Sequence, residues 1–288
     1  MSKPAPCERV PHKILYEQRP NYTRPPLELS DQVRQDLLGH LSFLYGQDQA
    51  DKYLPELERI LKVHHAFKSE SLRELLAECD PDHLFSENDM IMITYGDMIT
   101  DGTGTPLAML AKACDDYMLA PDILHILPFF PYSSDRGFSV VDFTKVDPRL
   151  GTWEDIHHLA GRYRLMFDGV LNHISAHSDA FHEFLDGNPD YQEFFIAYHS
   201  PDELTPDQRS KIFRPRVSDI LTPFMTINGI RYLWTTFSAD QIDLNYRSPK
   251  VLLSVVKALL FYIRQGADLL RLDAVTYIWA EPGTECIH

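Results

Sequence analysis

Residues 267–275 read ADLLRLDAV, an almost continuous apolar stretch that ends in charged side chains. Such a run predicts a β-strand. Side chains alternate along a strand, so Arg271 and Asp273 project from one face near its carboxyl end, and Leu270 and Leu272 project from the other. The preceding residues, 250–264, have the apolar periodicity of a helix. We therefore expect a helix followed by a parallel strand.

The same alternation of strand and helix recurs towards the N-terminus. Apolar runs that we expect to be buried strands cover residues 90–95 and 122–128, a further expected strand covers residues 164–173, and helical patterns cover residues 107–118 and 152–163. Alternating strands and helices predict βαβ units and the α/β class. About four units are present, and the segments after the strands are the longer ones. This order is typical of a (β/α)8 TIM-barrel fold, whose active site lies in those loops.

The chain before the first expected strand has a different pattern. Residues 1–25 are rich in proline and charge and predict an irregular arm. Residues 29–77 repeat apolar side chains at helical spacing, with Ser30 as the candidate N-cap of the first helix. The expected domains are a helical N-terminal extension at residues 1–88 and the first half of a barrel at residues 89–288, including an insertion after the third strand at residues 174–240.

Composition excludes several classes of function. The formal net charge of -15 argues against a nucleic-acid partner and against an anionic membrane surface. The first residues contain no long apolar run, so we expect neither a signal peptide nor a membrane span. The cysteines are far apart and form no CxxC pair, which argues against zinc or redox chemistry and favours idle thiols in a reducing cytoplasm. They are Cys7, Cys79, Cys114 and Cys286.

Polar side chains gather at two of the expected strand ends. Arg271 and Asp273 could form a buried structural ion pair, or Asp273 could be a nucleophile whose pKa is held low by the neighbouring cation. Asp168, Asn172 and His173 end the third expected strand in FDGVLNH. His173 taken alone is compatible with a purely structural role. Two polar strand ends in one chain favour a functional site.

Three motifs, FDGVLNH (167–173), QIDLNY (241–246) and GADLLRLDAV (266–275), resemble conserved regions of the α-amylase superfamily, glycoside hydrolase family 13. Their order and spacing also fit that superfamily. The segments ILPFFPYSSDRGFSVVDF (126–143) and FRPR (213–216) resemble the group of sucrose and glucosylglycerate phosphorylases. The resemblance runs from about residue 90 to residue 288 and corresponds to the N-terminal part of such enzymes.

The resemblance implies a role for individual side chains. Asp273 would be the catalytic nucleophile. Asp135 would accept a hydrogen bond from a hydroxyl group of a bound glucosyl ring, and Phe138 would lie under that ring as an apolar platform. The remaining residues that the resemblance implies are His173, Gln241 and Arg271 around the sugar, and Arg214 and Arg216 facing the leaving group or the incoming phosphate.

The reaction implied by the resemblance is retaining glucosyl transfer from sucrose or a sucrose-like α-glucoside to phosphate, giving α-glucose 1-phosphate without a metal or cofactor. In this family the general acid/base is a glutamate after the fifth strand. Glu281 and Glu285 follow the nucleophile too closely to be that residue. We therefore expect the acid/base to be absent from this chain, and the chain alone to be inactive.

Two other functions remain open from the sequence. One is an α-glucosidase or amylosucrase-like hydrolase or transglucosidase, since the nucleophile motif is shared with those enzymes. The other is a non-catalytic half-barrel module that binds sugar. About four βα units also leave open sheet edges, which predicts edge-to-edge association of such chains.

Overall fold

The computed structural model describes residues 15–78, 87, 89–118 and 121–287. Much of the expected N-terminal arm, and Cys7 and Cys79, lie outside these residues. The chain divides into two compact units. The first contains the described residues of Met1–Leu127 together with Pro148–Phe167 and Lys257–Leu270, and the second contains Pro128–Asp147, Asp168–Val256 and Arg271–His288 up to residue 287. The domain boundaries expected from the sequence remain a prediction.

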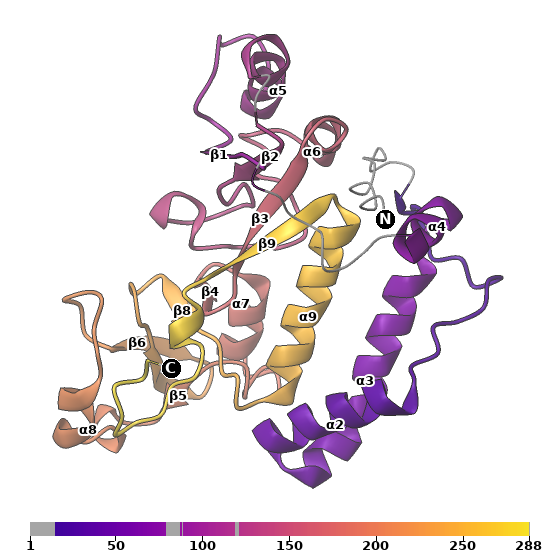
Figure 1. The fold of residues 1–288 in the computed structure, drawn as a ribbon. Helices are drawn as coiled ribbons and strands as arrows, with labels where there is room; N and C mark the ends of the chain where they lie inside the picture. Colours follow the sequence, from indigo (N-terminus) through magenta and orange to yellow (C-terminus); the bar gives the residue numbers. More distant parts are fainter. Residues whose placement is uncertain (1–14, 79–86, 88, 119–120, 288) are drawn as a thin grey trace. The chain divides into compact units, whose positions relative to one another are not determined.

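Three helices begin the first unit, as expected. They are α2 (Asp31–Tyr45), α3 (Gln47–Ala66) and α4 (Glu70–Glu78), and α2 and α3 pack against each other (Figure 1). The Ser30 hydroxyl accepts a hydrogen bond from the backbone N–H of Val33 at 3.3 Å, which confirms Ser30 as the N-cap.

A four-stranded sheet in the order β1-β2-β3-β9 forms the centre of the first unit. The pairs β1–β2 and β2–β3 are parallel, with Ile93 beside His125 and His125 beside Met166. Helices separate these strands along the chain, which confirms the partial (β/α) barrel-type architecture. The strands are β1 (Ile91–Thr94), β2 (Ile123–Ile126), β3 (Arg164–Val170) and β9 (Ala267–Asp273), and the helices are α5 (Pro106–Tyr117), α6 (Trp153–Ala160) and α9 (Pro249–Arg264).

Two details of the expected strands were wrong. The first strand is not buried on both faces, because β1 lies at the edge of the described sheet and pairs with β2 alone; Ile91 and Ile93 are 47% and 63% exposed. The third strand is shorter than expected and ends at Val170. His173 begins a separate strand, β4 (His173–Ser175), which pairs with a distant segment instead of continuing β3.

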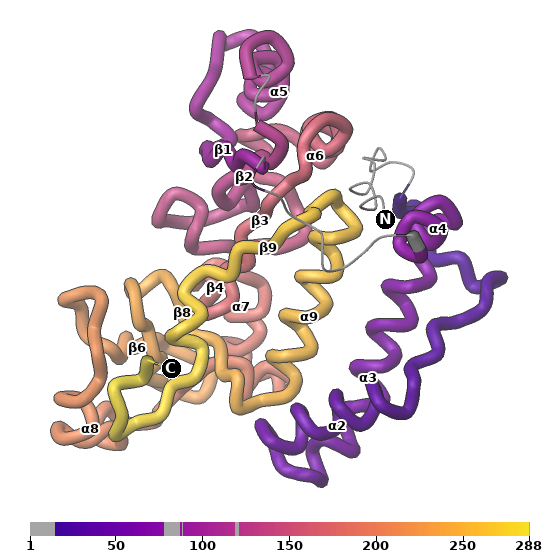
Figure 2. The backbone as a smooth tube through the Cα atoms, in the orientation of Figure 1, coloured from indigo at the N-terminus to yellow at the C-terminus, as the bar shows by residue number. Residues whose placement is uncertain are grey.

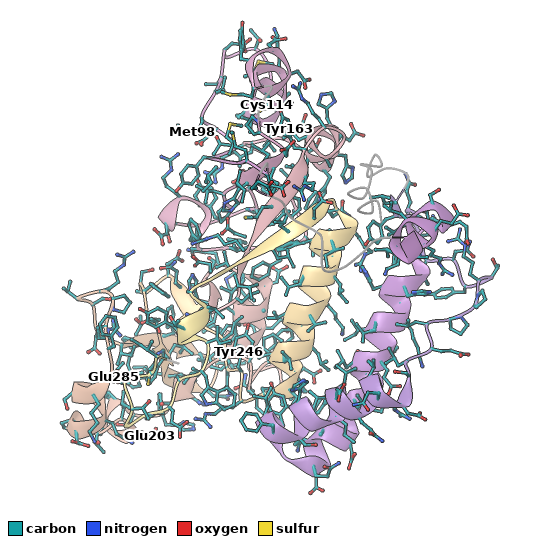
Figure 3. The ribbon with its side chains drawn as sticks, viewed as in Figure 1. Met98, Cys114, Tyr163, Glu203, Tyr246 and Glu285 are labelled. Atoms are coloured by element: carbon teal, nitrogen blue, oxygen red, sulfur yellow. The ribbon has the colours of Figure 1, made fainter. Side chains whose placement is uncertain are left out.

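The described cysteines are free and buried, as expected. Cys114 lies on α5, and its backbone carbonyl accepts a hydrogen bond from the Tyr163 hydroxyl at 3.2 Å (Figure 3). Burial raises the pKa of the Cys114 thiol, which keeps it protonated and unreactive. Cys286 belongs to an apolar cluster of the second unit.

The second unit contains two small antiparallel sheets. In one, β4 pairs with β8 (Gln241–Asp243), and the other has the order β5-β7-β6. Figure 2 follows the chain from β4 through α7 to the second sheet and back to β8. Aromatic side chains, including Phe181, Phe184 and Phe195, fill the core between these elements. The remaining elements are α7 (Asp179–Leu185), β5 (Ala197–Tyr198), α8 (Pro206–Lys211), β6 (Leu221–Thr226) and β7 (Gly229–Trp234).

Over the described ranges, no helix is long and apolar enough to cross a membrane.

Candidate active site

The second unit contains a pocket of about 430 Å³ that collects several of the residues expected from the sequence. Its lining comes from three segments that are far apart in the chain, and both acidic and basic side chains contribute. The lining residues are Ser134, Asp135, Arg216, Phe237, Ser238, Ala239, Asp240 and Gln241.

Asp135 lies at the tip of a tight turn, the 3-10 segment η2 (Asp135–Gly137). Its backbone is left-handed with a φ of 55°, and Arg136 follows with a φ of 48°. Gly137 completes the turn at a φ of 107°, and a Cβ there would lie 2.5 Å from the carbonyl oxygen of Pro128. Only glycine is compatible with that approach. The sequence DRG thus places the Asp135 carboxylate at the pocket.

Gln241 connects this turn to strand β8. Its side-chain amide Nε2 donates to Asp135 Oδ2 at 3.1 Å and to the carbonyl oxygen of Phe138 at 3.3 Å. Gln241 is buried, whereas Asp135 is exposed. The structure therefore brings Asp135, Phe138 and Gln241 together, while their roles towards a sugar remain predictions.

His173 completes this group from strand β4. Its ring Nε2 donates to the carbonyl oxygen of Phe138 at 2.8 Å, and its Nδ1 accepts from the Asn172 amide at 3.3 Å. Burial lowers the pKa of His173 to about 4, so the ring is neutral near pH 7. A neutral ring with a defined tautomer is a fixed polar group rather than a counter-ion.

Asp273 ends strand β9 beside Arg271. The guanidinium Nη1 of Arg271 lies 3.1 Å from Asp273 Oδ1 and also donates to the fully buried Asp168. The same guanidinium carbon lies 6.0 Å from the centre of the Phe138 ring. The alternation expected for this strand is therefore confirmed, and Phe138 connects the two groups of candidate residues.

The expected low pKa of Asp273 is wrong. Burial raises the pKa of this carboxyl group, and the nearby charge of Asp168 adds to the rise, so that together they outweigh the opposing effect of Arg271. Arg271 divides its charge between two carboxylates, which explains why it does not dominate either one. The carboxyl group of Asp273 still ionises, but at a higher pH than an ordinary aspartate.

The two arginines of FRPR differ in their surroundings. Arg216 lines the pocket together with Asp135. Arg214 instead donates from Nη2 to the backbone carbonyl oxygen and hydroxyl of Ser218 within its own loop. Arg214 is also close enough to the buried Asp243 for their charges to interact. The structure thus brings Arg216, but not Arg214, to the pocket lining.

Five of the eight lining residues were not predicted from the sequence, among them Phe237 and Asp240. The ring of Phe237 lies 5.2 Å from that of His173 and 5.3 Å from that of Tyr277, so it forms an aromatic wall. Asp240 immediately precedes the QIDLNY motif and contacts the turn that carries Asp135. Their position in the sequence could have indicated them, because both residues lie just before Gln241 in TTFSADQ.

Neither glutamate that follows the nucleophile is placed for acid/base chemistry. Glu281 forms an exposed ion pair with Arg247 at 3.6 Å. Glu285 is labelled, with Glu203, at the lower left of Figure 3, and its backbone oxygen accepts from the N–H of Phe213 at 2.9 Å. In the described part of the chain, no group of three or more His, Cys, Asp or Glu side chains could hold a metal ion.

Comparison with known families extends this picture. Residues 117–285 match the model of the alpha amylase catalytic domain, and that range is more than half of the chain. The chain belongs to the α-amylase family. The resemblance found in the motifs around Asp168, Gln241 and Asp273 is therefore confirmed at the level of the family, while the roles of single residues remain predictions.

Individual relatives of this α-amylase family member are phosphorylases. A glucosylglycerate phosphorylase of Allomeiothermus silvanus is 46% identical over 90% of this chain and 44% of its own length. A sucrose phosphorylase of Bifidobacterium adolescentis is 32% identical over 69% of this chain and 40% of its own length. The solved structure of sucrose 6F-phosphate phosphorylase from Thermoanaerobacter thermosaccharolyticum superposes with a TM-score of 0.65 at 29% identity, covering 70% of this chain and 43% of that one. The chain thus spans less than half the length of the relatives that it matches.

Proposed function

We propose that this α-amylase family chain provides the nucleophile and the glucosyl-binding pocket of a retaining α-glucoside phosphorylase. The observation that supports this most strongly is the placement of Asp273. Its carboxylate is oriented by Arg271 at 3.1 Å, and the Arg271 guanidinium in turn faces the Phe138 ring near Asp135. A carboxylate at the carboxyl end of a barrel-type strand is the usual position of a catalytic group in such folds.

The proposed reaction proceeds in two displacements. Asp273 attacks the anomeric carbon of the donor, the glycosidic bond breaks, and the leaving oxygen takes a proton from a carboxylic acid. A phosphate oxygen then attacks the same carbon and releases Asp273, giving α-glucose 1-phosphate with overall retention. Of the glutamates that follow Asp273, neither Glu281 nor Glu285 is placed to supply the acid, so the reaction requires a further carboxyl group.

Three residues of the pocket lining, Asp135, Gln241 and Phe237, and their neighbours His173 and Phe138 have a proposed part in holding the glucosyl group. Asp135 and Gln241 offer a carboxylate and an amide that already bond to each other, so hydroxyl groups of a sugar meet a prearranged polar edge. His173 is neutral and held by Phe138, which suits a fixed polar contact. The rings of Phe138 and Phe237 offer apolar faces for the ring of the sugar.

Phosphate is the proposed acceptor because a cation lines the pocket. The planar guanidinium of Arg216 can bond two phosphate oxygens at once, which water cannot match. Arg214 could bind phosphate in the same way only after breaking its hydrogen bonds to Ser218. On that condition we assign Arg214 to the acceptor loop.

The proposed donor is glucosylglycerate, with sucrose as the second candidate. Identity to the glucosylglycerate phosphorylase is 46% over 90% of the chain, against 32% over 69% for the sucrose phosphorylase. The buried free thiols Cys114 and Cys286 fit the cytoplasm, where phosphate is also available as a substrate.

Product analysis of the full-length protein tests this function. Glucosylglycerate and sucrose are each incubated with and without inorganic phosphate, and the products are separated. We expect α-glucose 1-phosphate in the presence of phosphate, formed faster from glucosylglycerate. Equal release of free glucose with or without phosphate would instead assign a hydrolase, and binding of glucose without turnover of any α-glucoside would assign a non-catalytic sugar-binding module.

A further inference from the structure

Asp240 accepts hydrogen bonds from the serine hydroxyls of the turn that carries Asp135. Its Oδ2 accepts from Ser133 Oγ at 2.5 Å, from Ser139 Oγ at 2.7 Å and from Ser134 Oγ. Ser133 and Ser139 flank the turn on either side, and the backbone N–H of Ser133 donates to the carbonyl oxygen of Ser139 at 3.1 Å. One carboxylate oxygen therefore contacts both ends of the turn. We call Asp240 and these three serines the serine clamp.

The turn needs external support because its backbone is unfavourable. Asp135 and Arg136 are consecutive non-glycine residues with φ values of 55° and 48°. The left-handed region is unfavourable for a residue with a Cβ, and two such residues in succession persist only where their surroundings impose the conformation. Backbone hydrogen bonds close the base of the turn, from the Ser133 N–H to the Ser139 carbonyl oxygen and from the Val141 N–H to the Pro131 carbonyl oxygen at 2.7 Å. The serine clamp adds side-chain contacts at the same base.

The charge on Asp240 strengthens these contacts. Burial raises the pKa of the Asp240 carboxyl group, but the hydrogen bonds from Ser133, Ser134 and Ser139 outweigh burial and leave the pKa lowered. An ionised acceptor makes shorter and stronger hydrogen bonds than a neutral one. The backbone carbonyl of Asp240 also accepts from the N–H of Ala176 at 2.9 Å, so the clamp is anchored between strands β4 and β8.

From this arrangement we infer that Asp240 is a positioning residue of the pocket. Its carboxylate holds the turn at residues 133–139 in the strained form in which Asp135 reaches Gln241 and the pocket. Asp240 lines the pocket, but its Oδ2 is occupied by three hydroxyl groups, and the effect inferred here is the one that it has through Asp135. The functional part of this inference rests on the proposed function, because it takes Asp135 as a ligand of the glucosyl group.

A double-mutant cycle in the full-length protein tests the functional part. Asp240→Ala should lower kcat/KM for the α-glucoside by on the order of 10- to 100-fold, because Asp135 loses its fixed position. In an Asp135→Ala background, Asp240→Ala should lower kcat/KM by less than about 2-fold, because Asp135, the residue through which Asp240 acts, is already removed. Asp240→Asn, which keeps an acceptor oxygen without the charge, should restore part of the loss. An equal fold-loss of kcat/KM from Asp240→Ala in the wild-type and Asp135→Ala backgrounds would overturn the inference.

Asp142→Ala is the matched control. The Asp142 carboxylate also accepts from a hydroxyl, that of Thr144 at 2.6 Å, and pairs with Lys145 at 2.8 Å, but it holds a different turn. This variant should keep wild-type kcat/KM. If kcat/KM of Asp142→Ala falls as far as that of Asp240→Ala, the loss is not specific to Asp240 and the inference fails.

A structural measurement separates the clamp from the proposed function. A crystal structure of Asp240→Ala should show Asp135 and Arg136 outside the left-handed region and the bond from Gln241 to Asp135 broken. If the wild type turns over no α-glucoside but the turn rearranges in this way, the proposed function fails and the clamp stands. An unchanged turn contradicts the clamp whatever the activity. Should Asp240→Ala not fold, the double variant Ser133→Ala/Ser139→Ala removes the contacts at both ends of the turn, keeps Asp240 and Ser134, and is judged by the same two measurements.

Discussion

At the scale of single residues, the carboxyl group of Asp273 has competing neighbours. Arg271 favours its ionised form, whereas burial and the charge of Asp168 disfavour it, and the net effect is a raised pKa. A nucleophilic carboxylate must be ionised, so activity should be lost as the pH falls through this raised pKa. The acid limb of kcat/KM in the full-length protein should therefore lie above the ordinary aspartate value of about 3.9.

Asp168→Asn provides the comparison for that pH profile. The substitution removes the negative charge that raises the pKa of Asp273 and releases Arg271 to pair with Asp273 alone. The acid limb should then move to lower pH. Movement to higher pH, or no movement, would show that Asp273 does not control this limb.

Arg216 carries a prediction about the acceptor. Arg216→Ala should lower kcat/KM for phosphate by on the order of 10- to 100-fold and raise the fraction of donor that ends as free glucose, because the bidentate contact is lost while water needs none. Arg216→Lys keeps the charge but not the planar guanidinium, so its kcat/KM for phosphate should lie between those of the wild type and Arg216→Ala. Arg231→Ala is the control, since Arg231 donates to the carbonyl oxygen of Tyr198 outside the pocket lining. An unchanged product ratio in Arg216→Ala would remove Arg216 from the acceptor site.

Sequence motifs contained several of the polar residues of the site, and the exceptions have a physical reason. Asp135, His173 and Gln241 lie in recognisable motifs; Gln241 donates to Asp135, and Gln241 and His173 both donate to the Phe138 carbonyl oxygen. Asp240 escaped notice because its partners are serines about 100 positions earlier, and serine and aspartate are common on any surface loop. Contacts of that kind depend on tertiary structure and leave no local pattern.

At the scale of elements, the helices and strands expected from periodicity were found, and their ends were less predictable. The FDGVLNH motif looks like the end of one strand, but β3 stops at Val170 and His173 begins β4. The reason is the pairing of β4 with β8, in which His173 lies opposite Asp243. A partner 70 positions away decides the boundary, so the local apolar pattern could not show it. The low burial of β1 has a similar cause, since it depends on which neighbours the strand has.

A prediction about stability belongs to the packing of α3 against the second half of α9. His64 on α3 is buried, and its Nδ1 lies 3.5 Å from Nη1 of Arg264. Burial, together with the charge of Arg264, lowers the pKa of His64 from 6.5 to about 4. The unfolded chain therefore binds a proton at a higher pH than the folded one does. The contribution of His64 to stability is complete above about pH 6.5 and is lost progressively towards pH 4, by up to about 3 kcal/mol.

Urea denaturation between pH 7 and pH 4 measures this effect. The wild type should lose more stability over that range than His64→Gln, in which the titrating ring is absent. His40→Gln, at an exposed position on α2, should follow the wild type. Parallel pH dependence in the wild type and His64→Gln would contradict the assignment.

At the scale of the whole molecule, the described sheet has exposed apolar side chains on both of its outer strands. Ile91 and Ile93 on β1, and Leu272 on β9, are exposed at the edges of the order β1-β2-β3-β9. An edge strand with unpaired backbone groups and apolar side chains favours pairing with another chain. We therefore expect the 288-residue polypeptide, produced alone, to self-associate and to form no α-glucose 1-phosphate.

Size-exclusion chromatography with light scattering tests this association. The apparent mass should rise with concentration, and Ile93→Lys should reduce the rise by placing a charge on the edge strand. Phe43→Lys is the matched control, because Phe43 is equally apolar and 89% exposed but lies on α2. A concentration-independent monomer would contradict the edge prediction, and turnover by this polypeptide would show that another carboxyl group replaces the expected acid.

The central claim is that Asp273 forms a covalent bond to the glucosyl group, and mass spectrometry of the trapped intermediate tests it most directly. The full-length protein is mixed with donor in the absence of phosphate, quenched in acid and digested. We expect one hexosyl unit on the peptide that contains Asp273. We expect no adduct in Asp273→Asn, whose turnover should fall by at least about 10³-fold. A hexosyl group on a different residue, or full turnover by Asp273→Asn, would contradict the account.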